Sequence, residues 1–175
     1  PKGRTRALLK IEDGCNNFCT YCIIPYARGR VRSLPPALAE QETARLQQAG
    51  VHEIVLTGIE IASYGRDLQP KSTLVDLLCS LLPAHPTVRF RLGSLDPRVV
   101  DEDFCRRLAG FDNLAQHFHL SLQSGCDTVL ERMGRRYTTE QYYHSVQLLR
   151  DAFPDCSVTT DLIVGFPGET EADFT

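Results

Sequence analysis

The stretch ALLKIEDGCNNFCTYC (7–22) joins a short apolar run to three closely spaced cysteines. ALLKI (7–11) has the length and composition of a β-strand, and Cys15, Cys19 and Cys22 follow it with the spacing C-x3-C-x2-C. In parallel α/β sheets the functional residues lie in the loops that follow the carboxyl ends of the strands. This segment therefore predicts a fold class and the position of a site together.

The rest of the chain alternates expected strands with expected helices. Strands are expected at 53–57, 88–92, 117–122 and 157–166. Helices are expected at 33–50, 72–82, 96–110 and 138–153, and another begins at Thr170. Capping boxes mark the starts at Thr138 and Thr170, Asp96 is the expected N-cap of the third helix, and Gly50, Pro83 and Gly110 are expected stops.

This alternation predicts parallel strands with right-handed crossovers. We expect an α/β fold whose five strands form an open sheet or a partial (β/α) barrel, because a closed barrel needs more strands. The cysteines and the motifs TGIE, GSLDP, LQSG and GFPGE all follow expected strands, so they should gather on one rim.

The composition is that of one soluble globular domain. Of 175 residues, 42% are hydrophobic and 23% are charged, and there is neither an apolar run of membrane-spanning length nor a signal-peptide pattern. Both ends of the sequence resemble internal positions of a longer protein, so we expect a fragment. Seven cysteines without a secretory context indicate reduced thiols and a cytoplasmic location. The net charge is -3, but residues 1–32 hold seven Lys or Arg against two acidic residues, a local excess of +5.

Three closely spaced thiolates suit an iron–sulfur cluster. Spacing alone leaves two alternatives, a structural zinc with a distant fourth ligand and three unrelated thiols. The other cysteines lie singly and are expected to be small core residues: Cys79, Cys105, Cys126 and Cys156. With three protein ligands, a four-iron cluster keeps one iron open for a small molecule.

Four segments carry a resemblance to a known family. The loop C-x3-C-x-aromatic-C, with Tyr21 in the aromatic place, resembles the radical S-adenosylmethionine (SAM) superfamily. GCNNFCTYCIIPYARGR, LTGIEIASYG, HLSLQSGCDTVLERMGRRYT and DLIVGFPGET resemble its methylthiotransferases in order and spacing. The branch that methylthiolates N6-threonylcarbamoyladenosine (t6A) in tRNA is most similar, and the isopentenyladenosine and ribosomal-protein branches are the alternatives.

The resemblance implies a [4Fe-4S] cluster on Cys15, Cys19 and Cys22, with SAM on the fourth iron. It implies the following cofactor-binding residues: Tyr21 in the cluster loop, the backbone of Thr57, Gly58 and Ile59 for the methionine amino group, Ser121 and Gln123 for the ribose or methionine, Arg135 for the carboxylate, and Ile163, Val164, Gly165 and Phe166 for the adenine.

In this family a reduced cluster cleaves SAM to a 5′-deoxyadenosyl radical, which takes hydrogen from an adenine carbon. Sulfur is inserted there, and a second SAM supplies the methyl group. The resemblance thus implies tRNA and a reducing partner such as flavodoxin or ferredoxin. It also implies an N-terminal domain with a second cluster and a C-terminal RNA-binding domain, which residues 1–175 lack. We therefore expect this radical SAM core to lack complete activity alone.

Several polar residues admit two interpretations. Arg28, Arg30 and Arg32 share one side if their segment is extended, where they either contact RNA phosphates or form a solvated face. Tyr26 either stacks on a base or packs against the cysteine loop. Glu60 is either a site residue or a solvated carboxylate.

Strand 117–123 should have one polar and one apolar face. Its polar face comprises His117, His119, Ser121 and Gln123, and its apolar face comprises Phe118, Leu120 and Leu122. The apolar face should meet the helices, and the polar face should point into the barrel. The histidines form either a structural network or part of a polar ligand site, and metal ligation is the weaker hypothesis because no third ligand is suggested.

Two non-catalytic classes are the rivals to an enzyme. A simple electron-transfer iron–sulfur module would need four protein ligands, whereas the loop offers three. A zinc-stabilised binding domain would hold one zinc instead of about four irons, so metal analysis distinguishes the classes.

Overall fold

The computed structural model of the protein describes residues 5–174. Its strands are β1 (Arg6–Lys10), β2 (Glu12–Asp13), β3 (Arg32–Ser33), β4 (Glu53–Thr57), β5 (Arg89–Leu92), β6 (His117–His119) and β7 (Ser157–Thr159). Its α-helices are α1 (Ile24–Arg28), α2 (Pro36–Gln48), α3 (Leu74–Ala84), α4 (Glu102–Leu108), α5 (Asp127–Arg132), α6 (Thr139–Ala152) and α7 (Glu171–Phe174). Two short 3-10 turns are η1 (Ile61–Ser63) and η2 (Pro97–Val99).

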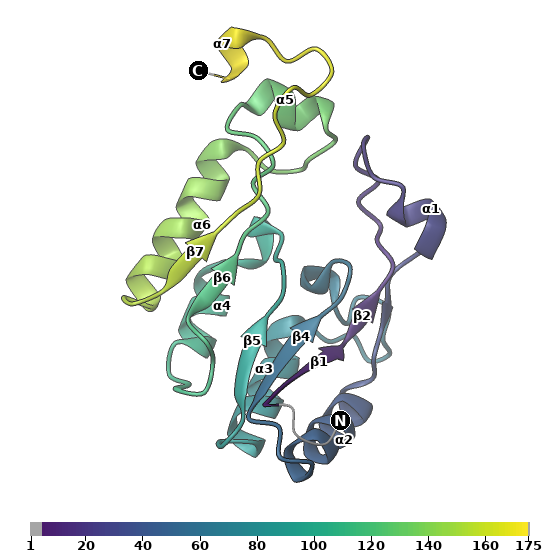
Figure 1. Cartoon of the computed structure of the whole chain (residues 1–175), viewed down its shortest axis with the longest axis vertical. Coiled ribbons are helices and arrows are strands. Elements are labelled where there is room, and N and C mark those ends of the chain that lie inside the picture. Colours follow the sequence, from purple (N-terminus) through teal and green to yellow (C-terminus); the bar gives the residue numbers. More distant parts are fainter. Residues whose placement is uncertain (1–4, 175) are drawn as a thin grey trace.

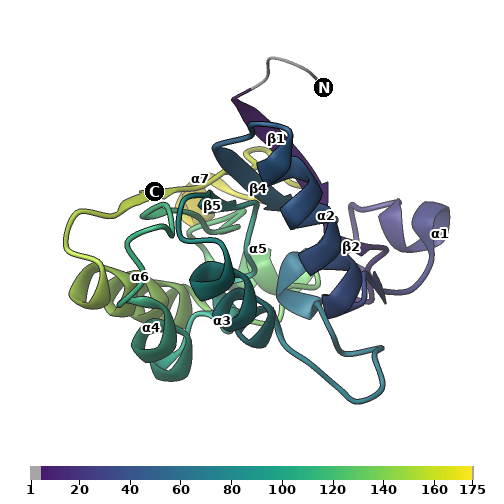
Figure 2. The same ribbon diagram turned by 90° about the horizontal axis from the view of Figure 1, so that it is seen from below.

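The parallel strands form one open, curved row. Strands β1, β4 and β5 make a parallel sheet, and β6 and β7 make a parallel pair. Single bridges at Phe90–Leu114 and Leu95–Leu120 connect the two parts. Figure 1 shows the row, and Figure 2 shows α2, α3, α4 and α6 along one side of it. The α/β fold with parallel strands and no closed barrel is confirmed among the described residues.

Alternation along the strands separates a core face from a polar face. Ile54 and Leu56 of β4, Phe90 of β5, and Phe118 with the following Leu120 are completely buried. Burying each such side chain contributes about 1.5–3 kcal/mol. The ring of Phe118 packs against Phe104 and Phe153 of the helical layer, with centroids 6.2 and 5.0 Å away. The expected apolar face at Phe118 and Leu120 is confirmed, whereas Leu122 is only half-buried.

The helix starts follow the local capping signals. Thr138 forms a complete capping box with Gln141, as expected, and Thr73 does the same with Asp76. At Thr170 the Asp173 carboxylate accepts from the backbone N–H at 3.0 Å. These pairs lie three residues apart, so the sequence alone contains the information for them.

Four predicted boundaries were wrong. Residues 96–110 form two elements, because Asp96 caps only η2 while Asp101 caps α4. Pro83 lies inside the last turn of α3 and does not end it, since so near the end it removes only one helical hydrogen bond. The strands expected at 117–122 and 157–166 each stop after three residues.

The strand pair shortens where its backbone changes conformation. Gln123 has a φ of 73°, which an extended strand does not allow, and beyond β6 the contact continues as one bridge from Gln123 to Leu162. Among residues 5–174, no helix combines the length and apolar composition needed to cross a membrane.

Candidate functional site

The cysteine loop closes against its own end. Gly14 has a φ of 86°, and a Cβ there would lie 2.1 Å from the carbonyl oxygen of Arg30. The N–H of Cys15 donates to the carbonyl of Gly29 at 3.0 Å. Only glycine fits this close approach in the left-handed conformation. Gly14, which directly precedes Cys15, therefore fixes the start of the loop after β2.

The three thiols lie in one electrostatic environment. Cys15 is buried, and Cys19 and Cys22 are half-buried. Burial raises the pKa of the Cys15 thiol, and the nearby Glu60, Cys19 and Cys22 raise that pKa further. A cation or metal cluster at the loop would offset this cost and favour the thiolate form.

Three cysteines in one loop are a donor set that suits an iron–sulfur cluster. In the part of the chain that the structure describes, no three His, Cys, Asp or Glu side chains are grouped to hold one metal ion. Zinc would need its sulfurs about 2.3 Å from a common centre. An iron–sulfur cluster instead attaches each cysteine to a different iron.

The remaining cysteines have contacts of their own among the described residues. Cys105 is buried in the hydrophobic core, and Cys79 and Cys156 pack against that core, as expected. Cys126 differs, because it precedes α5 and its thiol contacts the Thr128 hydroxyl at 3.1 Å and the Asp173 carboxylate at 3.4 Å.

A second part of the chain holds the far side of the cysteine loop. The N–H of Thr20 donates to the carbonyl of Met133 at 3.0 Å, and the Thr20 hydroxyl donates to the carbonyl of Arg132 at 2.9 Å. The guanidinium of Arg135 donates to the Cys19 sulfur at 3.3 Å. The loop is therefore fixed both to β2 and to the segment after α5.

Arg135 links the cysteine loop to the end of β6. Its Nε donates to the Tyr137 hydroxyl at 2.9 Å, and its guanidinium lies 5.0 Å from that ring's centroid. The Tyr137 hydroxyl in turn donates to the carbonyls of Ser121 and Leu122. The structure thus places Arg135 in contact with Cys19, and Arg135 and Tyr137 connect Cys19 to the carbonyl of Ser121.

The turn after β4 is held by a buried carboxylate. The Oε2 atom of Glu12 accepts from the N–H groups of Ile59 at 2.9 Å and Glu60 at 2.8 Å. The N–H of Ile11 donates to the carbonyl of Thr57 at 2.9 Å. The turn at Thr57, Gly58 and Ile59 lies beside β2, which leads into Cys15, and the N–H of Ile59 is already bonded to Glu12. Sequence reasoning missed Glu12 because its partners lie 47 and 48 positions away.

Glu60 is not a solvated loop carboxylate. Burial raises its pKa to about 7, the negative charge of Asp96 acts in the same direction, and a hydrogen bond from Ser63 opposes both. Its Oε1 atom is buried and has no hydrogen-bond partner among the described residues. A carboxyl of this kind exchanges protons near neutral pH.

The segment expected at the adenine lies beside the cysteine loop. The ring of Tyr21 meets the ring of Phe166 edge to face, with centroids 6.2 Å apart. Val164 is 64% exposed. A pocket of about 260 Å³ lies between this segment and the end of β6, lined by Leu122, Gln123, Ser124, Gly125, Leu162, Ile163, Val164, Glu169, Asp173 and Phe174.

The three arginines do not lie on one extended strand. Arg28 ends α1, Arg30 lies in the following loop and Arg32 belongs to β3. Asp13 pairs with Arg28 at 3.8 Å and with Arg32 at 3.6 Å. Arg32 also donates to the carbonyls of Arg28 and Arg30 at 2.9 and 3.2 Å. The expected alignment fails because Gly29 ends a helical turn within the segment.

Tyr26 contacts the cysteine loop yet stays exposed. Its ring meets Phe18 edge to face at 5.5 Å. Tyr26 is 74% exposed and Phe18 is 51% exposed. Packing against the loop is therefore present, and most of the Tyr26 ring remains available to a partner.

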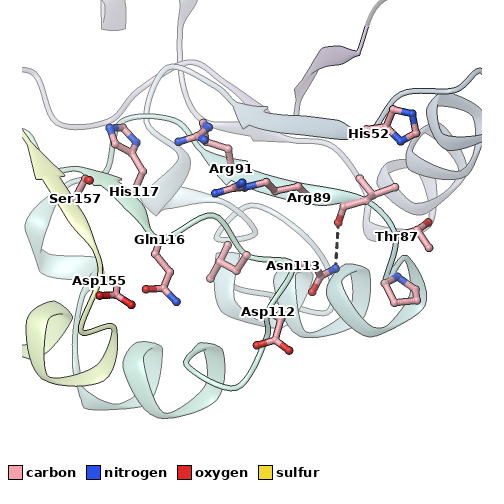
Figure 3. Close-up of a pocket in the computed structure, with 13 residues that line it drawn as sticks. His52, Thr87, Arg89, Arg91, Asp112, Asn113, Gln116, His117, Asp155 and Ser157 are labelled. Atoms are coloured by element: carbon pink, nitrogen blue, oxygen red, sulfur yellow. Dashed lines mark hydrogen bonds between the residues drawn. The ribbon is translucent and has the colours of Figure 1, made fainter.

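The histidines on the polar face form a local network. His119 Nδ1 lies 3.0 Å from the Thr159 hydroxyl, and His117 Nε2 lies 3.3 Å from the same atom. His117 also borders a pocket of about 640 Å³, in which Arg89 and Arg91 extend along one side (Figure 3). Because this pocket lies at the starts of β5, β6 and β7, it is separate from the cysteine loop, which follows a strand end.

Comparisons with known proteins agree with this arrangement. Residues 9–175 match the family model of the Radical SAM superfamily. The chain is 42% identical over 173 residues to the tRNA-2-methylthio-N(6)-dimethylallyladenosine synthase of Clostridium tetani, covering 99% of this chain and 38% of that protein. It is 44% identical over 172 residues to the threonylcarbamoyladenosine tRNA methylthiotransferase MtaB of Thermotoga maritima, covering 98% of this chain and 39% of that protein. The chain thus spans about two fifths of these relatives.

Solved structures share the fold at low sequence identity. The radical S-adenosylmethionine methyltransferase TsrM from Kitasatospora setae, with cobalamin and a [4Fe-4S] cluster bound, aligns with a TM-score of 0.76 at 20% identity, over 95% of this chain and 32% of that one. Coproporphyrinogen III oxidase (HemN) from Escherichia coli aligns with a TM-score of 0.64 at 18% identity, over 98% of this chain and 40% of that one.

Proposed function

Since this chain belongs to the radical SAM superfamily, we propose that it is the radical SAM core of a tRNA methylthiotransferase. The observation that carries the proposal is the cysteine loop itself, in which three free thiols follow a strand end. Cys15, Cys19 and Cys22 would hold a [4Fe-4S] cluster and leave one iron for SAM. When both are bound, they supply the one-electron cleavage of SAM to a 5′-deoxyadenosyl radical.

The chain's own residues would orient SAM and exclude water. The turn at Thr57, Gly58 and Ile59 would present its backbone to the methionine part, and Tyr21 and Phe166, whose rings meet edge to face, would lie on the adenine side. Arg135 lies between the Cys19 sulfur and the carbonyl of Ser121, within the region where the SAM carboxylate is expected. Holding the cofactor in one orientation contributes much of the rate of such reactions.

We propose t6A in tRNA as the substrate, with a methylthio group as the added group. The loop sequence supports the t6A branch, while relatives named for both modified adenosines match the chain. Mass spectrometry of tRNA nucleosides from strains with and without the gene separates the branches. Loss of methylthiolated t6A supports the proposal, and loss of methylthiolated isopentenyladenosine assigns the other branch.

The proposal includes macromolecular partners and a location. tRNA would approach the exposed side of α1 and its arginines, and a small reducing protein such as flavodoxin or ferredoxin would deliver electrons to the cluster. We propose a cytoplasmic location for the full-length protein, because both proposed partners would be encountered there.

Anaerobic reconstitution with iron and sulfide tests the proposal. We expect a brown protein with about four irons per chain, and loss of the cluster when Cys15, Cys19 or Cys22 is changed to Ala. Cys105→Ala is the matched control, because this cysteine is buried in the core and burial raises its pKa to about 11. One zinc per chain, or loss of the cluster on Cys105→Ala with the fold intact, would contradict the assignment and favour a non-catalytic module.

A further inference from the structure

Glu12 is a charged side chain in a buried position between two parts of the site. It is 1% exposed and belongs to β2, three residues before Cys15. Its carboxylate accepts the N–H groups of Ile59 and Glu60 at 2.9 and 2.8 Å. The last backbone hydrogen bond between the β1–β2 segment and β4 runs from the N–H of Ile11 to the carbonyl of Thr57. Beyond the end of β4, the Glu12 side chain takes over as the acceptor for the backbone of the turn.

Gly58 makes this arrangement possible. A Cβ at position 58 would lie 2.7 Å from Glu12 Oε2 and 2.8 Å from the Glu12 carbonyl oxygen. No larger residue fits without moving either the turn or β2. The glycine and the glutamate are therefore complementary parts of one contact.

The contact between Glu12 and the turn has a higher free-energy cost than structural support alone requires. Burial raises the pKa of Glu12, while the two backbone N–H groups lower it. Its second oxygen, Oε1, is buried without a hydrogen-bond partner among residues 5–174. A buried polar atom without a partner is destabilising, and such local costs are typical of functional sites.

We infer that Glu12 is a positioning residue that sets the distance between the cysteine loop and the turn at 57–60, and thereby the affinity for SAM. The identity of the ligand rests on the proposed function. The role of Glu12 in holding the turn is inferred from the contacts described above alone, so it can be measured without SAM.

The test compares Glu12→Ala and Glu12→Gln in the full-length protein. In Glu12→Ala the amide hydrogens of Ile59 and Glu60 should exchange at least about tenfold faster, because they lose their acceptor. After reconstitution this variant should retain its iron but bind SAM at least about tenfold more weakly by calorimetry. Glu12→Gln should stay close to the wild type in both measurements, because its amide oxygen still accepts both N–H groups.

Glu53→Gln is the matched control. Glu53 is a half-buried glutamate that pairs with Arg6 and Arg91 at the opposite end of β4. This variant should alter neither the exchange of the two amides nor SAM affinity.

Each other outcome has a distinct meaning. Unchanged amide exchange in Glu12→Ala would show that Glu12 does not hold the turn. Faster exchange with unchanged SAM affinity would show that the turn's position does not govern binding. If Glu12→Ala does not fold, Glu12→Asp replaces it, since the shorter side chain cannot reach both N–H groups. If the reconstituted wild type binds no SAM, the proposed function fails, while the exchange data still decide whether Glu12 holds the turn.

Discussion

Replacing Glu60 by Gln should remove a specific part of the pH dependence of stability. The pKa of Glu60 is raised from 4.5 to about 7, mainly by burial. Between these values the folded protein keeps a proton that the unfolded chain releases. The resulting stabilisation is fully present below pH 4.5 and is lost as the pH rises through 7.

The expected magnitude follows from the two pKa values. A carboxyl with a pKa of about 7 when folded and 4.5 when unfolded loses about 2.5 kcal/mol of folding free energy between pH 5 and pH 8. Glutamine does not titrate and preserves the shape of the side chain. The stability of Glu60→Gln relative to the wild type should therefore rise by about 2.5 kcal/mol over this interval.

Urea unfolding at a series of pH values, without added iron or SAM, measures this difference. Glu131→Gln is the control, because Glu131 is an exposed residue of α5 and should shift the whole curve without changing its shape. Parallel curves for Glu60→Gln and the wild type would show that Glu60 titrates normally and that the burial argument is wrong.

Two further substitutions test the loop and the turn. Changing Arg28, Arg30 and Arg32 to Gln in the full-length protein should weaken tRNA binding and lower its salt dependence by about 2 in the slope of log K against log salt. A filter-binding titration measures both quantities, and unchanged affinity with an unchanged slope would show that these arginines are only a solvated face. Gly58→Ala should reduce the free energy of unfolding by about 2 kcal/mol, because the new Cβ would lie 2.7 Å from Glu12 Oε2. In the same urea assay Gly125→Ala, whose added Cβ has open space, should cost far less.

The sequence predicted the features that depend on near neighbours. Caps such as Thr138 with Gln141 need residues three apart, and the burial of Phe118 and Leu120 follows from alternation along one strand. The order of strands and helices then restricts the topology, because crossovers between parallel strands have one hand. For these reasons the sequence alone was enough to predict the α/β class and the loops at the carboxyl ends of the strands.

Features that depend on distant pairings were not accessible from the sequence. The short helices α1 and α5 have five and six residues, too few for a helical period to stand out. The β2–β3 pair has two residues in each strand. Glu12 looked like an ordinary charged residue beside Asp13, and only the return of the chain at Ile59 gives it a partner.

The arginines show how a local charge excess can mislead. The +5 excess of residues 1–32 suggests a uniformly cationic surface, but Asp13 lies among Lys10, Arg28 and Arg32 at 3.2, 3.8 and 3.6 Å. The hydrogen bond from Lys10 and the surrounding positive charges lower the pKa of Asp13, so its carboxylate remains charged at neutral pH. Part of the excess is therefore used to hold the start of the loop to its end.

The site depends on two parts of the sheet that are only weakly paired with each other. Cys15 follows β2 and lies close to the β1–β4–β5 sheet through Glu12, whereas Cys19 contacts Arg135 beside the β6–β7 pair. Within residues 5–174, single bridges are the strand pairing between these parts. A group bound by both cysteines would connect the two halves directly, and binding to the folded arrangement alone stabilises that arrangement. The same contacts that position the cysteines therefore couple cofactor binding to the order of the whole rim, where SAM and the substrate would meet.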